Sequence, residues 1–167
     1  PRLDFLASLY HPRKITPATL EIIDVPGLTR GSGTAFLAAV REVDALLHVV
    51  RAFSNEAVPH VEGNLNPLRD LEMINADLLL ADLQLVETRL ERIAASRKVK
   101  GDLQAEQNAL RRCQEVLEAE KPLVEANLTP GEWQVLRHMG FLTTKPMFIV
   151  VNIDEEQLKA GHYQGEK

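Results

Sequence analysis

Short apolar runs alternate with segments of helical spacing along this chain. The runs at 19–24, 44–53 and 146–152 are bounded by polar residues, and two of them are rich in β-branched side chains, which is typical of buried strands. The segment 34–42 has the spacing of a short helix. This alternation predicts an α/β fold with a mostly parallel sheet.

A longer helical pattern separates the second predicted strand from the third. The loop 54–66 ends at Asn66, which is a candidate N-cap residue, and Pro67 follows it as a first-turn proline. We therefore expect a helix from there to about Arg97. Its later apolar positions are spaced by four and three residues, and after the turn at 98–101 the spacing is seven. These positions are Leu79, Leu83, Val86, Leu90 and Ile93, then Leu103, Leu110, Leu117 and Val124.

The two apolar seams predict an antiparallel helical hairpin. Charged residues flank both seams, which favours a solvated coiled-coil arm over a helical pair buried inside a bundle. We therefore expect a coiled-coil insertion at 70–125, and a sheet domain formed by 1–69 together with 126–167.

Composition narrows the possible classes of protein. The chain has 167 residues, 45% of them hydrophobic and 26% charged, enough for one core with an appended arm. Its net charge of -5 gives no general attraction to nucleic acid, so no sequence-specific DNA binding is expected and an RNA contact needs a local basic patch. The single cysteine, Cys113, excludes an intrachain disulfide, and no apolar run approaches the ~20 residues that span a bilayer. We expect a cytoplasmic protein with no membrane partner.

The first predicted strand ends in the motif Asp24-Val25-Pro26-Gly27. This DxxG pattern lies beside the γ-phosphate in P-loop NTPases, where the carboxylate serves Mg²⁺ and the glycine amide approaches phosphate. Asp24 is therefore a candidate Mg²⁺ residue, acting through a water molecule, and Gly27 is a candidate nucleotide contact. The alternative is a simple turn after a strand.

The third predicted strand ends in Asn152-Ile153-Asp154-Glu155. Ligands favour the carboxyl ends of such strands. Asn152 could bind a base edge there, and Glu155 could accept from exocyclic donors. A strand end without a ligand is an equally ordinary interpretation.

A nucleotide site of this type also needs a phosphate-binding loop of the form GxxxxGK[ST]. No glycine in this sequence is followed by Lys and then Ser or Thr, and the chain begins at Pro1-Arg2. We therefore expect the chain to be a partial G domain taken from a longer protein.

Four stretches carry a resemblance to a known family. They are PRLDFLASLYHPRKITPATLEIIDVPGL, HVVRAF, PLRDLEMINADLLLADLQLVETRLERI and KPMFIVVNIDE. With them, nearly the whole chain resembles the YchF or Obg-like ATPases, which are P-loop NTPases of the translation-factor class. The resemblance implies a G-domain fold with a coiled-coil insertion, ATP hydrolysis with Mg²⁺, and binding to the ribosome, on its large subunit. In the family a small TGS domain normally follows, which we expect to lie outside this chain.

The resemblance also implies a nucleotide preference. The GTPase pattern NKxD ends in Asp, whereas Glu155 occupies that place here, which favours ATP over GTP. On this interpretation Asn152 binds the adenine edge, the Ile153 backbone lies along it, and Asp154 fills a variable position.

Catalysis needs a further residue. Ras-type enzymes orient the attacking water with a Gln just after DxxG, but Leu28 stands here and cannot do so. His60, in the segment VPHVEG, is the candidate, because a neutral imidazole accepts a hydrogen bond from water. A partner or a monovalent cation such as K⁺ could also contribute, and a loop histidine without any chemistry is the alternative. His48, within LLHVV, is expected to be a satisfied core residue.

One departure from the family lies in the switch segment. Only Ser32-Gly33-Thr34 separates DVPGLTRG from the next helix, where the family has a longer glycine-rich segment. A true deletion would impair sensing of the γ-phosphate, and we interpret the shortening instead as a mobile loop that went unobserved.

The leading hypothesis is a ribosome-associated switch protein that binds and hydrolyses ATP, of which this chain alone is inactive. The first alternative is a non-enzymatic interaction module whose coiled coil is the binding surface. The second alternative is a GTPase.

Overall fold

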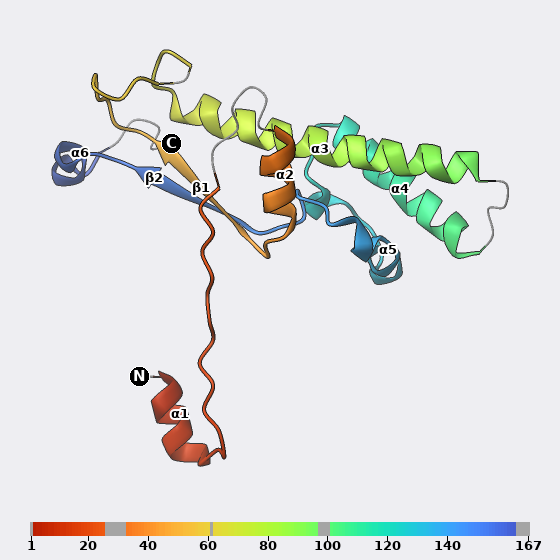
Figure 1. Cartoon of the computed structure of the whole chain (residues 1–167), viewed down its shortest axis with the longest axis horizontal. Helices are drawn as coiled ribbons and strands as arrows, with labels where there is room; N and C mark the ends of the chain where they lie inside the picture. Colours follow the sequence, from red (N-terminus) through yellow and green to blue (C-terminus); the bar gives the residue numbers. More distant parts are fainter. Residues whose placement is uncertain (1, 26–32, 61, 97–100, 163–167) are drawn as a thin grey trace.

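The computed structural model describes residues 2–25, 33–60, 62–96 and 101–162. Its elements are α1 (Arg2–Tyr10), α2 (Gly33–Arg41), β1 (Leu46–Arg51), α3 (Pro67–Ala95), α4 (Asp102–Glu118), the 3₁₀ turn η1 (Leu123–Glu125), α5 (Pro130–Leu136), the 3₁₀ turn η2 (Arg137–Met139), β2 (Met147–Asn152) and α6 (Glu155–Ala160). Figure 1 shows the sheet towards one end of the molecule, the C-terminal end of α3 at the other, and α1 set apart on an extended segment.

The two strands form a parallel sheet in which Leu46 is the register partner of Met147 and Arg51 that of Asn152. Parallel strands require a crossover connection, and here it is the helical segment from α3 to η2. The prediction of an α/β fold with parallel strands is confirmed for these two runs, and the predicted helix at 34–42 is confirmed as α2.

The predicted strand at 19–24 is wrong. Residues 11–25 have no helix or strand, and the side chains of Leu20 and Ile22 are 85% and 77% exposed. A strand needs a neighbour that takes up its backbone N–H and C=O groups. The described residues offer this segment no such neighbour, so its apolar pattern alone does not produce a strand.

The chain runs without interruption from residue 1 to 167. The short connection before α2 is therefore a property of the sequence, and its interpretation as an unobserved loop is wrong. Residues 26–32 of this connection lie outside the described part.

Local sequence signals fix the start of α3. The Asn66 side chain accepts a hydrogen bond from the Arg69 N–H at 3.1 Å, and Pro67 occupies the first turn. The helix ends at Ala95, two residues before the expected end. Its first half packs against the sheet in one core cluster, which contains Val40, Leu46, Leu78, Ala81 and Leu142.

The second half of α3 packs against α4. The two seams supply buried residues to a second core cluster, among them Val86, Ile93, Leu110 and Leu117. This cluster continues into η1 and α5, so α4 is covered on one side by the chain that follows it. Val124 is an exception to the predicted seam: α4 ends at Glu118, and the Val124 side chain is 69% exposed. The domain boundaries at 70 and 125 stay a prediction.

A partly buried ion pair also joins the two helices. Arg89 donates from Nε and Nη2 to the two carboxylate oxygens of Glu106, at 2.7 and 2.9 Å. Such a bidentate pair is stronger than a neutral hydrogen bond, and the guanidinium holds the pKa of Glu106 below its usual value.

Two charged side chains anchor the turn that leads into β2. The buried Asp82 carboxylate accepts from the Leu142 N–H at 2.9 Å and from the N–H and Oγ1 of Thr143, both at 2.8 Å. Burial raises the pKa of Asp82, while these donors oppose the shift. Lys145 Nζ donates to the carbonyls at the end of α2, those of Val40, Arg41 and Val43. The start of β2 is thus fixed to both α3 and α2.

None of the described helices combines the length and apolar character that crossing a bilayer requires.

Candidate functional site

The carboxyl ends of β1 and β2 lie at one edge of the sheet. Arg51 and Asn152, the last residues of the strands, are direct register partners. Beyond them the Ala52 N–H donates to the Asn152 carbonyl at 2.8 Å, so the pairing extends one step further. The segments 53–66 and 153–162 both leave this edge, where ligands of parallel α/β sheets bind.

The predicted base-binding residues follow β2 directly. Asn152 is exposed and Ile153 is half-buried. Glu155 is the first residue of α6, and its side chain is 91% exposed, with an ion pair to Lys159 Nζ at 3.8 Å. The side chains of Asn152 and Glu155 are therefore open to a ligand at this edge.

Asp154, which we expected to fill a variable position, begins α6. Its carboxylate accepts from the Gln157 N–H at 2.8 Å, and the Gln157 side-chain oxygen accepts from the Asp154 N–H at 2.9 Å. Gln157 Nε2 also donates to the Ala52 carbonyl at 2.7 Å, which joins α6 to the end of β1. The Asp-x-x-Gln spacing of this capping box was a visible signal in the sequence.

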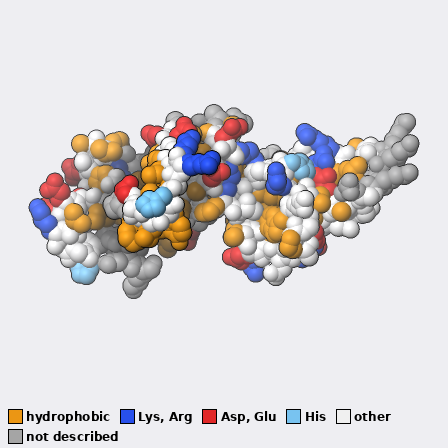
Figure 2. All heavy atoms as spheres, turned by 90° about the horizontal axis from the view of Figure 1, so that it is seen from below, with side chains coloured by type: hydrophobic (Ala, Val, Ile, Leu, Met, Phe, Trp, Pro, Cys, Tyr) orange, Lys and Arg blue, Asp and Glu red, His pale blue; other side chains and the backbone are white. Residues whose placement is uncertain are grey.

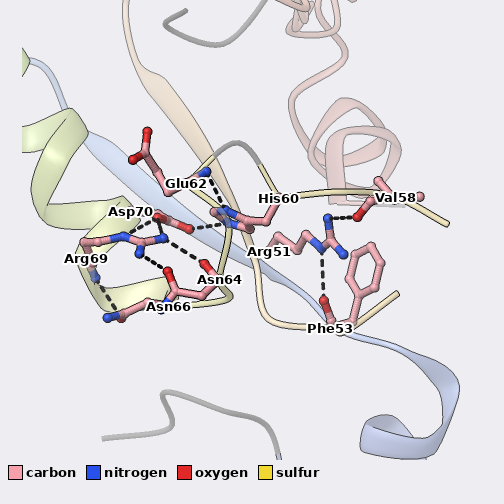
Figure 3. A network of polar contacts seen from close by, with 9 residues as sticks. All are labelled: Arg51, Phe53, Val58, His60, Glu62, Asn64, Asn66, Arg69 and Asp70. Carbon is pink, nitrogen blue, oxygen red and sulfur yellow. Dashed lines mark hydrogen bonds and ion pairs between the residues drawn. The ribbon is translucent and has the colours of Figure 1, made fainter. Parts of the chain in front are cut away.

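His60 lies in the loop between β1 and α3, close to the first turn of α3 (Figure 3). Its Nε2 is 2.9 Å from Asp70 Oδ2, and its Nδ1 accepts from the Glu62 N–H at 3.2 Å. The side chains of His60 and Asp70 are 15% and 21% exposed. Both ring nitrogens of the predicted catalytic histidine therefore have partners within the protein.

The opposite side of Asp70 is bound by Arg69. Arg69 donates from Nε and Nη2 to Asp70 Oδ1 at 3.1 and 2.8 Å. The same guanidinium donates to the side-chain and main-chain oxygens of Asn64, at 2.5 and 2.9 Å. The sequence analysis identified neither Arg69 nor Asp70, because an adjacent Arg and Asp on a helix give no sign of what they contact.

Arg51 secures the other part of the loop. It donates to the carbonyls of Phe53 and Val58 at 3.0 and 2.8 Å (Figure 3). It also donates to the Asn55 carbonyl at 3.3 Å, and its guanidinium carbon lies 4.6 Å from the centre of the Phe53 ring. The cation and the aromatic face attract each other. The loop that carries His60 is therefore held by one arginine at each side.

The predicted phosphate-contact residue Gly27 and the predicted metal residue Asp24 are not part of the described hydrogen-bond network around His60. Asp24 is exposed, and within the described residues no hydrogen bond or ion pair joins it to His60 or Asn152. Gly27 and Leu28 lie outside the described residues. No group of three His, Cys, Asp or Glu side chains in the described part could hold a metal. Mg²⁺ in nucleotide sites takes one or two carboxylates with water and phosphate oxygens, so an exposed Asp24 fits that role chemically.

Two other residues with reactive side chains, His48 and Cys113, are not part of the hydrogen-bond network around His60. His48 in β1 is half-buried, and its Nδ1 has no hydrogen-bond partner among the described residues, so the expected satisfied core histidine is not found. Burial lowers the pKa of His48, and the charge of Asp70 opposes that shift. Burial raises the pKa of the Cys113 thiol to about 11, so this thiol is protonated near neutral pH.

A cleft of about 370 Å³ lies on the side of α3 near η2. Its basic lining residues are Arg41, Arg89, Arg92 and His138. Arg89 is paired with Glu106, and His138 Nε2 lies 3.4 Å from the same carboxylate. Arg92 is exposed and forms no ion pair with a described residue. The cleft is a local concentration of positive charge in an acidic chain.

Relatives of known function match nearly the whole chain, although no family model matches it. The ribosome-binding ATPase YchF of Escherichia coli O157:H7 is 37% identical over 172 residues, covering 98% of this chain and 47% of that protein. The protein of the same name from Bacillus subtilis is 36% identical, covering 94% of this chain and 45% of its own length. Obg-like ATPase 1 of Caenorhabditis elegans is 36% identical, covering 93% and 41%.

A solved structure gives the same relationship. The YchF GTPase of Schizosaccharomyces pombe superposes with a TM-score of 0.77 at 32% sequence identity, over 98% of this chain and 47% of that one. The chain thus spans about half the length of the curated relatives and of the solved structure that it matches.

Proposed function

Because this chain belongs to the YchF and Obg-like ATPase family, we propose that it is part of a ribosome-associated switch protein that binds and hydrolyses ATP with Mg²⁺. The observation that supports this most is the similarity of nearly the whole chain to proteins named ribosome-binding ATPase. We further propose the large ribosomal subunit as the contact and the cytoplasm as the compartment of this activity.

The proposed nucleotide site is the sheet edge at Asn152. The Asn152 side chain binds the adenine edge, the Ile153 backbone lies along the base, and Glu155 selects against guanine. Exposure of Asn152 and Glu155 at a strand carboxyl end supports this assignment. Asp24 serves Mg²⁺ through water, Gly27 contacts the γ-phosphate, and His60 accepts a hydrogen bond from the attacking water, with K⁺ as a further candidate cofactor. The bound Mg²⁺ would offset phosphate charge as it builds up during transfer.

Turnover measurements test these roles. In the full-length protein we expect Asp24→Ala and His60→Ala each to lower kcat for Mg²⁺-dependent ATP hydrolysis, His60→Ala by about 10²-fold, the low end for a positioned acid–base group. Asp77→Ala, an exposed carboxylate on α3, and His162→Ala are the matched controls and should keep the wild-type rate. Wild-type rates in both Asp24 and His60 variants would contradict the assignments.

Nucleotide preference is tested on the same protein with non-hydrolysable analogues. Glu155 predicts tighter binding of the ATP analogue than of the GTP analogue. Preference for the GTP analogue would instead favour the GTPase hypothesis, a possibility raised by the description of the fission yeast structure as a GTPase. We expect no turnover from the 167-residue chain alone, because it contains no GxxxxGK[ST] motif.

A non-enzymatic interaction module remains the second candidate. The helical hairpin with charged outer faces favours it. Deleting residues 70–125 is a poor test, since Leu78 and Asp82 within that range belong to the core beside the sheet. Substitutions on the exposed surface of the hairpin test the same idea without disturbing that core.

A further inference from the structure

The contacts of His60 define which of its ring nitrogens carries the proton. A backbone N–H always donates, so the Glu62 N–H at 3.2 Å requires an unprotonated Nδ1. A carboxylate only accepts, so Asp70 Oδ2 at 2.9 Å requires a proton on Nε2. The two partners agree on a single neutral tautomer, with Nε2 protonated and Nδ1 bare.

Asp70 is itself held in one orientation. It lies in the first turn of α3, where a carboxylate is favoured by the helix dipole, and its Oδ1 takes both hydrogen bonds from Arg69. Arg69 is in turn held by the two oxygens of Asn64. Oδ2 is therefore the oxygen left to face the imidazole, as Figure 3 shows.

We propose that Asp70 is a positioning residue for His60: it keeps the proton on Nε2 and so leaves Nδ1 as the atom that accepts a hydrogen bond from the attacking water. This inference rests on the proposed catalytic role of His60. In this role water replaces the Glu62 N–H at Nδ1, a single neutral hydrogen bond of 3.2 Å whose net free energy is modest. Arg69 contributes to this positioning, because by binding Oδ1 it determines that Oδ2 of Asp70 contacts the His60 imidazole.

The variant Asp70→Asn provides a sharp test because Arg69 dictates how the new amide lies. The two Arg69 donors require an acceptor, so the Asn oxygen faces Arg69 and the NH₂ group faces His60. The NH₂ group donates to Nε2, and the proton moves to Nδ1. The unprotonated nitrogen is then Nε2, which faces the new amide, and Nδ1 can no longer accept a hydrogen bond from water. The same exchange of tautomers occurs in catalytic triads whose orienting carboxylate is replaced by an amide.

Proton positions are read from ¹⁵N–¹H correlation spectra of the His60 ring, recorded on the 167-residue chain at a pH where the ring is neutral. We expect a proton on Nε2 in the wild type and on Nδ1 in Asp70→Asn. Arg69→Ala should keep the proton on Nε2, because Asp70 still accepts. The double variant Arg69→Ala/Asp70→Asn should also return it to Nε2, because the amide is then free to turn its oxygen to the ring.

A wild-type proton on Nδ1, or the same tautomer in Asp70→Asn, overturns the proposal, and the first of these results needs no variant to fold. A double variant that keeps the proton on Nδ1 overturns the part assigned to Arg69.

Turnover in the full-length protein separates this inference from the proposed function. We expect Asp70→Asn to lower kcat by about 10²-fold, as His60→Ala does, with little change in KM for ATP. A swapped tautomer with wild-type kcat, while His60→Ala is impaired, overturns the positioning role in turnover. A swapped tautomer with both variants fully active overturns the catalytic role of His60, and with it the role of Asp70 in turnover.

Discussion

At the scale of single residues, Asp82 shows how one buried carboxylate connects distant parts of the chain. It lies on α3 and accepts from the main chain of Leu142 and Thr143, about sixty positions further on. A buried acceptor with three donors contributes mainly by preventing those donors from being left unpaired. Asp82 therefore stabilises the turn before β2.

Replacing Asp82 by Ala should lower the free energy of unfolding by about 2–4 kcal/mol, because two backbone N–H groups and one hydroxyl lose their acceptor. Urea unfolding followed by circular dichroism measures this loss. Asp77→Ala, an exposed carboxylate on the same helix, is the control and should change the free energy by less than about 0.5 kcal/mol. Equal values for the two variants would refute a structural role for the Asp82 contacts.

At the scale of elements, the Arg89–Glu106 pair joins the two helices of the hairpin. The pKa of Glu106 is lowered mainly by its hydrogen bonds with Arg89, so its ionised form is favoured in the folded state. A lowered folded pKa contributes stability that is complete above the usual value near 4.5 and is lost as the pH falls through the folded pKa. The hairpin should therefore weaken in acid.

The variant Glu106→Gln measures this contribution. We expect its free energy of unfolding at pH 7 to be about 1–3 kcal/mol lower than that of the wild type. This difference should shrink as the pH is lowered below 4.5. Glu115→Gln, at an exposed position of α4, should match the wild type throughout. A difference that stays constant from pH 7 into acid would show that charge is not the cause.

The elements that the sequence predicted well are those with local signals. Asn66-Pro67 defines the start of α3, the apolar seams define the contact with α4, and a continuous apolar run defines each strand of the sheet. The run at 19–24 had the same kind of pattern but formed no strand, because pairing depends on a neighbour far away in the sequence.

The candidate site was predictable to a similar extent. The parallel order of β1 and β2 implies that the loop carrying His60 and the segment after Asn152 leave the same edge of the sheet. The contact of His60 with Asp70, and the contact of Asp70 with Arg69, do not follow from the sequence, because they depend on side-chain geometry that no spacing rule encodes. The cap at Asp154 was visible in the sequence and was missed.

At the scale of the whole molecule, charge and apolar surface are unevenly distributed. Figure 2 shows hydrophobic side chains gathered towards the end that carries the sheet and α1. No residue of α1 is buried, and exposed apolar residues of the sheet include Leu47, Val49, Phe148 and Ile149. The basic cleft beside α3 is a separate feature, and a phosphate-bearing partner would be attracted to its positive charge.

Charge reversal at Arg92 tests this cleft. For an RNA partner such as the ribosome, Arg92→Glu should weaken binding several-fold and reduce the slope of its salt dependence by about one, the loss expected for one phosphate contact. Lys159→Glu on α6, an exposed residue outside the cleft, is the control. Co-sedimentation with ribosomes over a range of salt concentrations measures both, and equal weakening by both variants would contradict a specific role for the cleft.

The continuity of α3 has a mechanical consequence. Its 29 residues begin beside the loop of His60 and end at the tip of the hairpin, with Asp82 as the fixed point between. At 1.5 Å per residue, about 22 Å of helix lies before that fixed point and about 20 Å after it. If α3 moved as a rigid body about this contact, a tilt imposed at the loop would reappear at the far end of the helix with nearly the same amplitude and the opposite direction.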